Sequence, residues 1–357
     1  MELSQLGWDE HYQKQVDELG IPDIIIGRVF RVDAGGHYGV ITVEGDLRAR
    51  IPGKMKDRAE SAADLPGIGD WVLMKSTETD NVIFKVLERK NVILRKAAGR
   101  EFKEQLVGAN IDIIFIVMGL DSDFNLRRLE RYLFMVSASG ASPIILLNKS
   151  DLAEDLEKQL EEVQKITDEI PVHYMSALKK EGIDIISDYL REGVTISVVG
   201  SSGVGKSTLI NALMNEEKLK TGEVRKKDGK GRHVTSSREL FLISGGGVII
   251  DNPGIREIQL WGDSVSLDEA FSDIGELAVH CKFRDCRHRT EPGCKVLDAV
   301  ESGDLPRERY ENYLKMQKEL AYLELKRDKG AQGAERAKWK GITNKADKYR
   351  KYKEKRD

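Results

Sequence analysis

Residues 200–207 read Gly200-Ser201-Ser202-Gly203-Val204-Gly205-Lys206-Ser207, which matches the phosphate-binding pattern G-x-x-x-x-G-K-[ST]. An apolar run over 195–199 precedes the segment and a helical pattern over 208–214 follows it, as the pattern requires. Glycines allow backbone N–H groups to close around a phosphate at a helix N-terminus, which carries partial positive charge. The sequence therefore predicts a strand, a phosphate loop and a helix. The alternative is an ordinary glycine turn that leads into a helix.

Several side chains near this loop suit a nucleotide with Mg²⁺. We expect Lys206 to bridge the β- and γ-phosphates and the Ser207 hydroxyl to bind Mg²⁺, with Thr208 completing the nucleotide-binding set. Asp251 follows another short apolar run, so it is placed at a strand end where it suits an indirect contact to Mg²⁺. Gly254 is expected to donate its N–H to the γ-phosphate.

A second motif predicts which base is bound. Asn148-Lys149-Ser150-Asp151 follows an apolar run over 143–147. The Asp151 carboxylate accepts both the N1–H and the N2–H₂ of guanine, a donor pair that adenine lacks. We expect the Lys149 stem to cover the base and Asn148 to brace the surrounding loops. An ATPase is therefore disfavoured.

A third segment completes the predicted base pocket. In Ser176-Ala177-Leu178, the small residue allows the backbone N–H of Ala177 to reach guanine O6. The two base motifs begin 52 and 24 residues before the phosphate loop, whereas most GTPases encode the phosphate loop first. That order implies circular permutation, which preserves a sheet when the original termini are adjacent.

The rest of the chain divides into further predicted units. Short β runs with glycine turns predict an OB-type, RNA-binding barrel, with a sandwich that binds nothing as the alternative. Alternating strand and helix patterns then predict a doubly wound, mostly parallel sheet. The predicted segments are an N-terminal extension (1–20), the barrel (21–98), the permuted GTPase domain (105–262), a zinc-binding helical domain (263–325) and a basic tail (326–357).

All three cysteines fall within 14 residues, as Cys281, Cys286 and Cys294, with His288 among them. Thiolates and an imidazole at this spacing suit tetrahedral Zn²⁺, and four protein ligands leave no open position. The sequence therefore predicts one structural zinc ion. His280 is an alternative fourth ligand, and three unrelated cysteines are the alternative to a site.

Charge is distributed unevenly over the 357 residues. The whole chain carries -3, but residues 326–357 contain 13 basic and 5 acidic residues, a net +8. A basic tail on an acidic body favours a polyanionic partner, and Trp339, Tyr349 and Tyr352 favour RNA; a solvated helix is the alternative. No run of 18 apolar residues and no signal peptide is found, and cysteines are few. We expect a cytoplasmic protein without membrane contact.

The motifs N-K-x-D, S-A-L, G-S-S-G-V-G-K-S, G-R-H-x-T and D-x-P-G occur in this order, between a predicted barrel and a Cys/His cluster. In this the chain closely resembles the RsgA/YjeQ family of circularly permuted GTPases that depend on the small ribosomal subunit. The resemblance covers about residues 22–325, and the tail is longer and more basic than is typical. It implies GTP hydrolysis stimulated by the 30S subunit and its 16S rRNA, in late subunit maturation, with turnover driving release. We expect a monomer.

The catalytic residues are predicted from the segment 221–237, whose composition suits a loop ordered by nucleotide. By resemblance, Thr235 closes on Mg²⁺ and the γ-phosphate. Ile255 stands where many GTPases have a water-orienting Gln and cannot orient water, so His233 is the candidate catalytic residue, beside Thr235 and Lys206. The alternative for His233 is an exposed residue without a catalytic role. Ile255 also leaves open a nucleotide-gated RNA-binding module whose hydrolysis is incidental.

Overall fold

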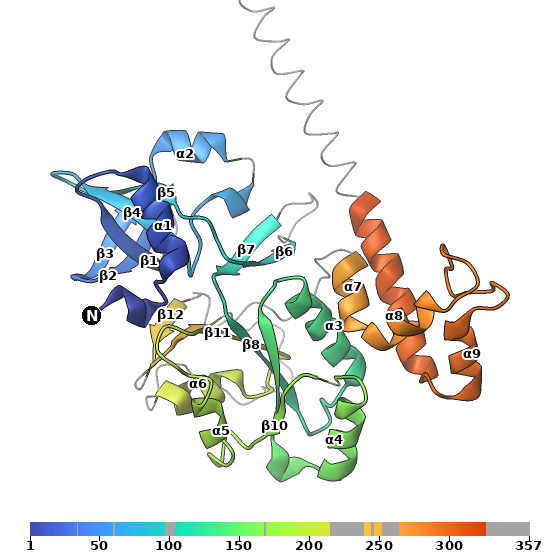
Figure 1. Cartoon of the computed structure of the whole chain (residues 1–357). Helices are drawn as coiled ribbons and strands as arrows, with labels where there is room; N and C mark the ends of the chain where they lie inside the picture. The colour runs from blue at the N-terminus through green and yellow to red at the C-terminus, as the bar shows by residue number, and fades with distance from the viewer. Residues whose placement is uncertain are drawn as a thin grey trace, which may run out of the picture.

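The computed structural model describes residues 1–33, 35–59, 61–96, 104–167, 169–214, 239–243, 246–251 and 264–325. The predicted residues His233, Thr235, Gly254 and Ile255, and the tail 326–357, lie outside these ranges. The described residues form a barrel, a central sheet with helices and a C-terminal helical module (Figure 1). None of the described helices is both long and apolar enough to cross a bilayer.

The barrel consists of five strands that close on themselves. They are β1 (Ile25–Asp33), β2 (His37–Thr42), β3 (Gly45–Arg50), β4 (Trp71–Ser76) and β5 (Asn81–Val86). The pairing runs β1-β2-β3-β5-β4 and returns to β1, so no strand edge of the barrel is left open. Val29, Val40, Val72 and Ile83 fill its interior. The sequence pattern missed β3 because only Ala49 of that strand is fully buried.

Short elements surround the barrel. They are η1 (Leu3–Leu6), α1 (Glu10–Leu19), α2 (Gly53–Arg58) and η2 (Ala62–Asp64), followed by a hairpin of β6 (Val92–Lys96) and β7 (Glu104–Ala109). Trp8 and Tyr12 pack against Trp71, which attaches the N-terminal helix to the barrel wall. The hairpin connects the barrel to the central sheet (Figure 1).

The central sheet confirms the doubly wound prediction. Its strands are β8 (Ile113–Gly119), β9 (Ser142–Asn148), β10 (Val172–Tyr174), β11 (Thr195–Gly200), β12 (Glu239–Leu242) and β13 (Val248–Asp251). The order β10-β9-β8-β11-β13 is parallel throughout, and β12 adds an antiparallel edge. One residue pair, Arg31 and Glu239, joins this edge to β1 of the barrel.

Successive side chains of the strands point to opposite faces of the sheet, and helices cover both faces. The helices are α3 (Leu126–Ser137), α4 (Leu156–Gln164), α5 (Asp184–Ser187) and α6 (Lys206–Met214), with the turn η3 (Ser150–Leu152). Ile114 and Ile116 of β8 share a core with α3 and α4, whereas Phe115 and Val117 share the opposite core with α5 and α6. A strand buried on both faces reads as a continuous apolar run, as β8 does.

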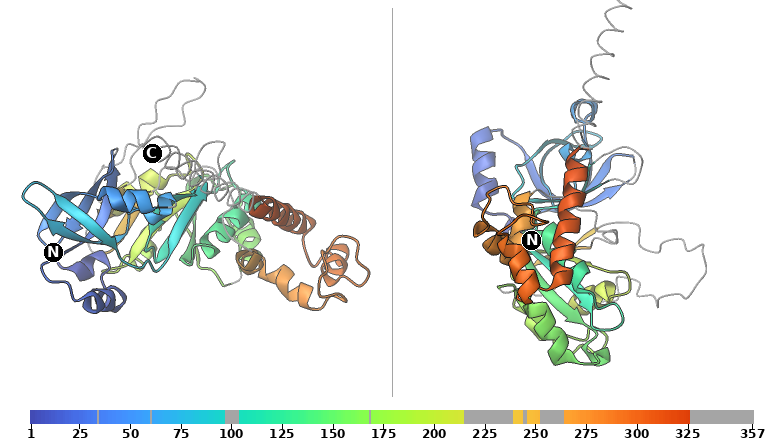
Figure 2. Two further views of the ribbon diagram at one scale, coloured as in Figure 1. Left: turned by 90° about the horizontal axis from the view of Figure 1, so that it is seen from above. Right: turned by 90° about the vertical axis from the view of Figure 1, so that its right-hand side faces the viewer.

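The C-terminal module comprises α7 (Ser264–Ala270), α8 (Ser272–Val279), α9 (Lys295–Ser302) and a helical stretch over 307–325. Phe271, Val296 and Met316 lie in its core together with Phe134 of α3. The module therefore packs on the central domain through α3, at the end opposite the barrel (Figure 2).

Candidate nucleotide site and metal centre

The parallel sheet brings the predicted nucleotide motifs to one edge. Gly200 ends β11, Asn148 ends β9 and Asp251 ends β13, and all three strands point the same way. Ligands of open α/β sheets bind at the carboxyl ends of the strands. The inverted order of the motifs along the chain therefore does not separate them in space.

The phosphate loop has the backbone that its glycines predict. Gly200, Gly203 and Gly205 have φ angles of 148°, 80° and 101°, a region that other residues rarely adopt. A Cβ atom on Gly205 would lie 2.3 Å from Asn148 Nδ2. Lys206 Nζ donates to the Gly200 and Ser201 carbonyls at 2.8 and 2.5 Å, so the ammonium lies across the loop.

Asn148 connects the phosphate loop to the base motifs. Its Nδ2 donates to the Val204 carbonyl at 2.7 Å, and its Oδ1 accepts from the Ala177 N–H at 2.9 Å. The side chain is 2% exposed, so both bonds form away from water. One buried amide thus fixes three loops relative to one another, because an unpaired buried amide would cost about 1–3 kcal/mol.

The other base-motif residues differ in their partners and their exposure. Lys149 Nζ contacts Asp121 Oδ2 at 2.7 Å, and Lys149 adopts a left-handed φ of 64°. Burial opposes the charge on Asp121, but the hydrogen bond and positive charge of Lys149, together with backbone N–H donors, outweigh burial and lower the pKa of Asp121. Asp151 is 11% exposed, with Lys179 Nζ at 3.9 Å. Leu178 is 80% exposed.

Asp251 is buried near the phosphate-loop lysine. Burial raises its pKa to about 6, and the positive charge of Lys206 opposes that rise. Such a carboxylate suits a cation bound beside the loop, because a divalent ion would restore the charge that burial disfavours.

Sequence reasoning did not find two residues that contact the predicted motifs. Arg128 of α3 donates to the Ser201 hydroxyl and pairs with Asp123. Asp121, the partner of Lys149, follows β8. Neither belongs to a local motif, so only the fold reveals their contacts.

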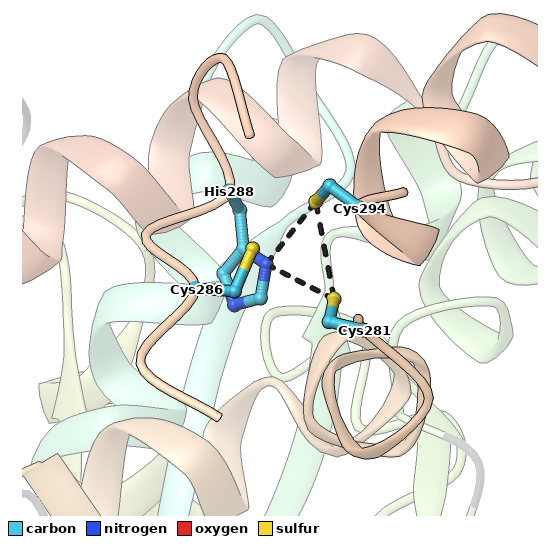
Figure 3. Close-up of side chains that lie close together, drawn as sticks. All are labelled: Cys281, Cys286, His288 and Cys294. Carbon is cyan, nitrogen blue, oxygen red and sulfur yellow. Dashed lines mark hydrogen bonds between the residues drawn. The ribbon is translucent and has the colours of Figure 1, made fainter. Parts of the chain in front are cut away.

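The four predicted zinc ligands form one cluster. The sulfur atoms of Cys281, Cys286 and Cys294 and a ring nitrogen of His288 lie within 4.8 Å of one another (Figure 3). Cys281 follows α8, Cys294 precedes α9, and the other two lie on the intervening loop. His280 is not part of this group.

The distances within the cluster agree with tetrahedral zinc. Cys281 Sγ lies 3.9 Å from Cys294 Sγ, and His288 Nδ1 lies 3.6 and 3.4 Å from these two sulfurs. Bonds of about 2.3 Å to sulfur and about 2.0 Å to nitrogen require edges of about 3.8 and 3.5 Å. The donor set and its spacing are therefore compatible with Zn²⁺.

Comparison with known proteins identifies the family. Residues 86–261 match the model of the RsgA GTPase family. The small ribosomal subunit biogenesis GTPase RsgA 1 of Oceanobacillus iheyensis is 42% identical, over 98% of this chain and all of the relative. The chain belongs to the RsgA family. It is a circularly permuted GTP hydrolase, as the sequence predicted.

Further RsgA relatives support this assignment. RsgA of Methanosarcina acetivorans is 48% identical over 80% of this chain and 78% of the relative. The crystal structure of YjeQ from Thermotoga maritima superposes with a TM-score of 0.62 at 27% identity, covering 84% of this chain and 99% of the other. RsgA family membership implies GTP, GDP and Mg²⁺ as ligands.

Proposed function

We propose that this chain binds GTP and Mg²⁺ between the phosphate loop and the base motifs, hydrolyses GTP, and acts on the small ribosomal subunit. The observation that carries the proposal is the Asn148 side chain, which bonds to both Val204 and Ala177. Because one buried amide bridges the two motif sets, a single nucleotide can contact both.

Each site residue has a proposed role. Asp151 binds guanine N1–H and N2–H₂, Ala177 binds O6, and the Lys149 stem lies against the base. Lys206 binds the β- and γ-phosphates. The remaining nucleotide ligands are Gly200 to Ser202, Gly203 to Gly205, Ser207, Thr208, Ser176, Leu178, Asp251 and Gly254.

Magnesium and the catalytic step are assigned to two segments. Ser207 and Thr235 hold Mg²⁺, and the metal would neutralise charge on the phosphates. His233 is the proposed catalytic residue, because Ile255 has no group that orients water. His233, Thr235 and Ile255 lie outside the described residues.

The zinc cluster is proposed to be structural. Cys281, Cys286, His288 and Cys294 would hold one Zn²⁺, and its role is to fold the loop between α8 and α9. Four protein ligands leave no position for a substrate, so the metal would have no part in hydrolysis.

The proposed partner is the 30S subunit with its 16S rRNA, bound by a monomer. Relatives with 42% and 48% identity are named small ribosomal subunit biogenesis GTPases. The net charge of +8 on residues 326–357 supports an RNA contact. Hydrolysis in late maturation is proposed to release the chain from the subunit.

The decisive measurement is GTP turnover by the full-length chain with and without purified 30S subunits. Slow basal turnover and strong stimulation are expected. Stimulation that survives His233→Ala removes that residue from the mechanism, and an absence of any stimulation contradicts the ribosomal assignment.

A further inference from the structure

Helix α3 contacts the phosphate loop on one side. Arg128 lies in its first turn, donates to the Ser201 hydroxyl, and is held by Asp123. One turn further along, the Tyr132 hydroxyl is buried and also neighbours Ser201, whose hydrogen bond opposes the rise in the Tyr132 pKa that burial causes. Two polar groups of α3, the Arg128 guanidinium and the Tyr132 hydroxyl, therefore lie next to Ser201 of the phosphate loop.

The same helix is attached to the C-terminal module through buried charge. Glu130 is fully buried, and its carboxylate accepts from Arg127, Arg309 and Asn312. The Arg309 contact measures 3.0 Å, and that guanidinium is itself 3% exposed. Removing one partner of such a buried pair typically costs about 3–5 kcal/mol, so α3 and the 307–325 helix are expected to move together.

A second, partly exposed contact strengthens this attachment. Arg131 forms a two-point contact with Glu319, with N···O distances of 2.9 and 3.1 Å. Phe134, with no exposed surface, completes the attachment within the module core. In Figures 1 and 2, α3 lies between the sheet and the module.

The contact of α3 with the sheet is of a different kind. There it packs through apolar side chains such as Leu129 and Leu133, which form no hydrogen bonds that would fix their position. Packed apolar surfaces permit small sliding movements, whereas buried ion pairs resist separation. A displaced module is therefore expected to carry α3 with it and to move Arg128 relative to Ser201.

We propose that α3 couples the C-terminal module to the phosphate loop, with Arg128 as the positioning residue for the loop. In one state Arg128 holds Ser201 and orders the loop for nucleotide. In the other, the displaced module draws Arg128 away and nucleotide binds more weakly. The inference rests on the proposed function, since it takes residues 200–207 as the phosphate site. By linkage, bound nucleotide stabilises the undisplaced position of the module, in which Arg128 contacts Ser201.

A double-mutant cycle on the full-length, zinc-loaded chain tests the coupling, with affinity for a fluorescent GDP analogue as the readout. Arg128→Met is expected to weaken binding about tenfold and Glu319→Gln about threefold. The double variant is expected to bind no more weakly than Arg128→Met alone, because the module then has no route to the loop. Arg128→Lys is expected to recover part of the affinity, because lysine can still donate to Ser201.

The control is Glu311→Gln, which removes a surface pair with Arg307 on the same helix and is expected to leave affinity unchanged. If the losses of GDP affinity in the two single variants multiply in the double variant, the sites are independent and the coupling is overturned. An unchanged affinity in Glu319→Gln also overturns it. If Arg128→Met does not fold, Ser201→Ala removes the same hydrogen bond from the other side. A wild-type chain that binds no GDP contradicts the proposed function itself, whereas binding without coupling contradicts only this inference.

Discussion

The buried Asp251 carboxylate lowers the free energy of unfolding at neutral pH, where it is ionised. Burial raises the pKa of its carboxyl group to about 6 from the ordinary value of 3.8, so between these pH values the folded chain holds a proton that the unfolded chain releases. The contribution of this group to stability is therefore present at low pH and is lost as pH rises through 6.

We accordingly predict that Asp251→Asn stabilises the ligand-free chain at pH 8, by about 1–3 kcal/mol, and about half as much at pH 5. The same change should weaken Mg²⁺-dependent GTP binding, and the wild-type affinity should fall below pH 6 while that of the variant stays level. Thermal denaturation and nucleotide titration across pH measure these effects. Exposed Asp46→Asn is the control, and a variant less stable at pH 8 would contradict the assignment.

Asp151 makes a separate prediction about the base. In Asp151→Asn an amide N–H₂ replaces one acceptor of guanine donors, so GTP affinity should fall about 100-fold or more. Xanthine carries an oxygen where guanine has its N2 amine, so xanthosine triphosphate should bind the variant better than GTP. Competition binding measures the ratio. Asp155→Asn is the control, since Asp155 caps α4 through Lys158 N–H and Asn caps equally well.

At the scale of elements, local pattern was sufficient for α3 and for the strands of the central sheet. Their apolar runs and helical spacing directly indicate which side chains are buried. The pattern failed for β3, because a strand with one buried side chain looks like a loop. The Cys/His cluster was predictable because the spacing of its residues is local. The contacts Arg128–Ser201 and Lys149–Asp121 were not, because they join segments 73 and 28 residues apart.

The loop between α8 and α9, which carries the proposed zinc cluster, gives the next prediction. Cys286→Ser should lose its zinc, and the C-terminal module should become sensitive to protease, because the metal would supply much of the folding free energy of this loop. His280→Ala should retain one zinc per chain. Metal analysis and limited proteolysis distinguish the variants, and loss of zinc from His280→Ala would show that the ligand set is wrong.

At the scale of the whole molecule, one side chain joins the barrel to the central domain. Arg28 of β1 is 1% exposed and bonds to acceptors in four segments. These acceptors are the Leu6 carbonyl, the Gly69 carbonyl at 3.0 Å, the Asn110 carbonyl at 2.9 Å and Thr195 Oγ1 at 2.8 Å. Burial lowers the pKa of Arg28 to about 10, so the guanidinium remains charged at neutral pH.

Thr195 begins β11, the strand that ends at the phosphate loop, so Arg28 fastens the barrel to the base of the nucleotide-binding strand. Arg28→Met leaves several buried acceptors without a donor, at about 1–3 kcal/mol each. Calorimetry should then show a barrel transition at lower temperature, while GDP still raises the transition of the central domain. Arg50→Met is the matched control, because its pair with Asp80 is exposed and should contribute less than about 1 kcal/mol. Equal small losses in the two variants would show that the barrel is held by its apolar contacts and by the Arg31–Glu239 strand pair instead.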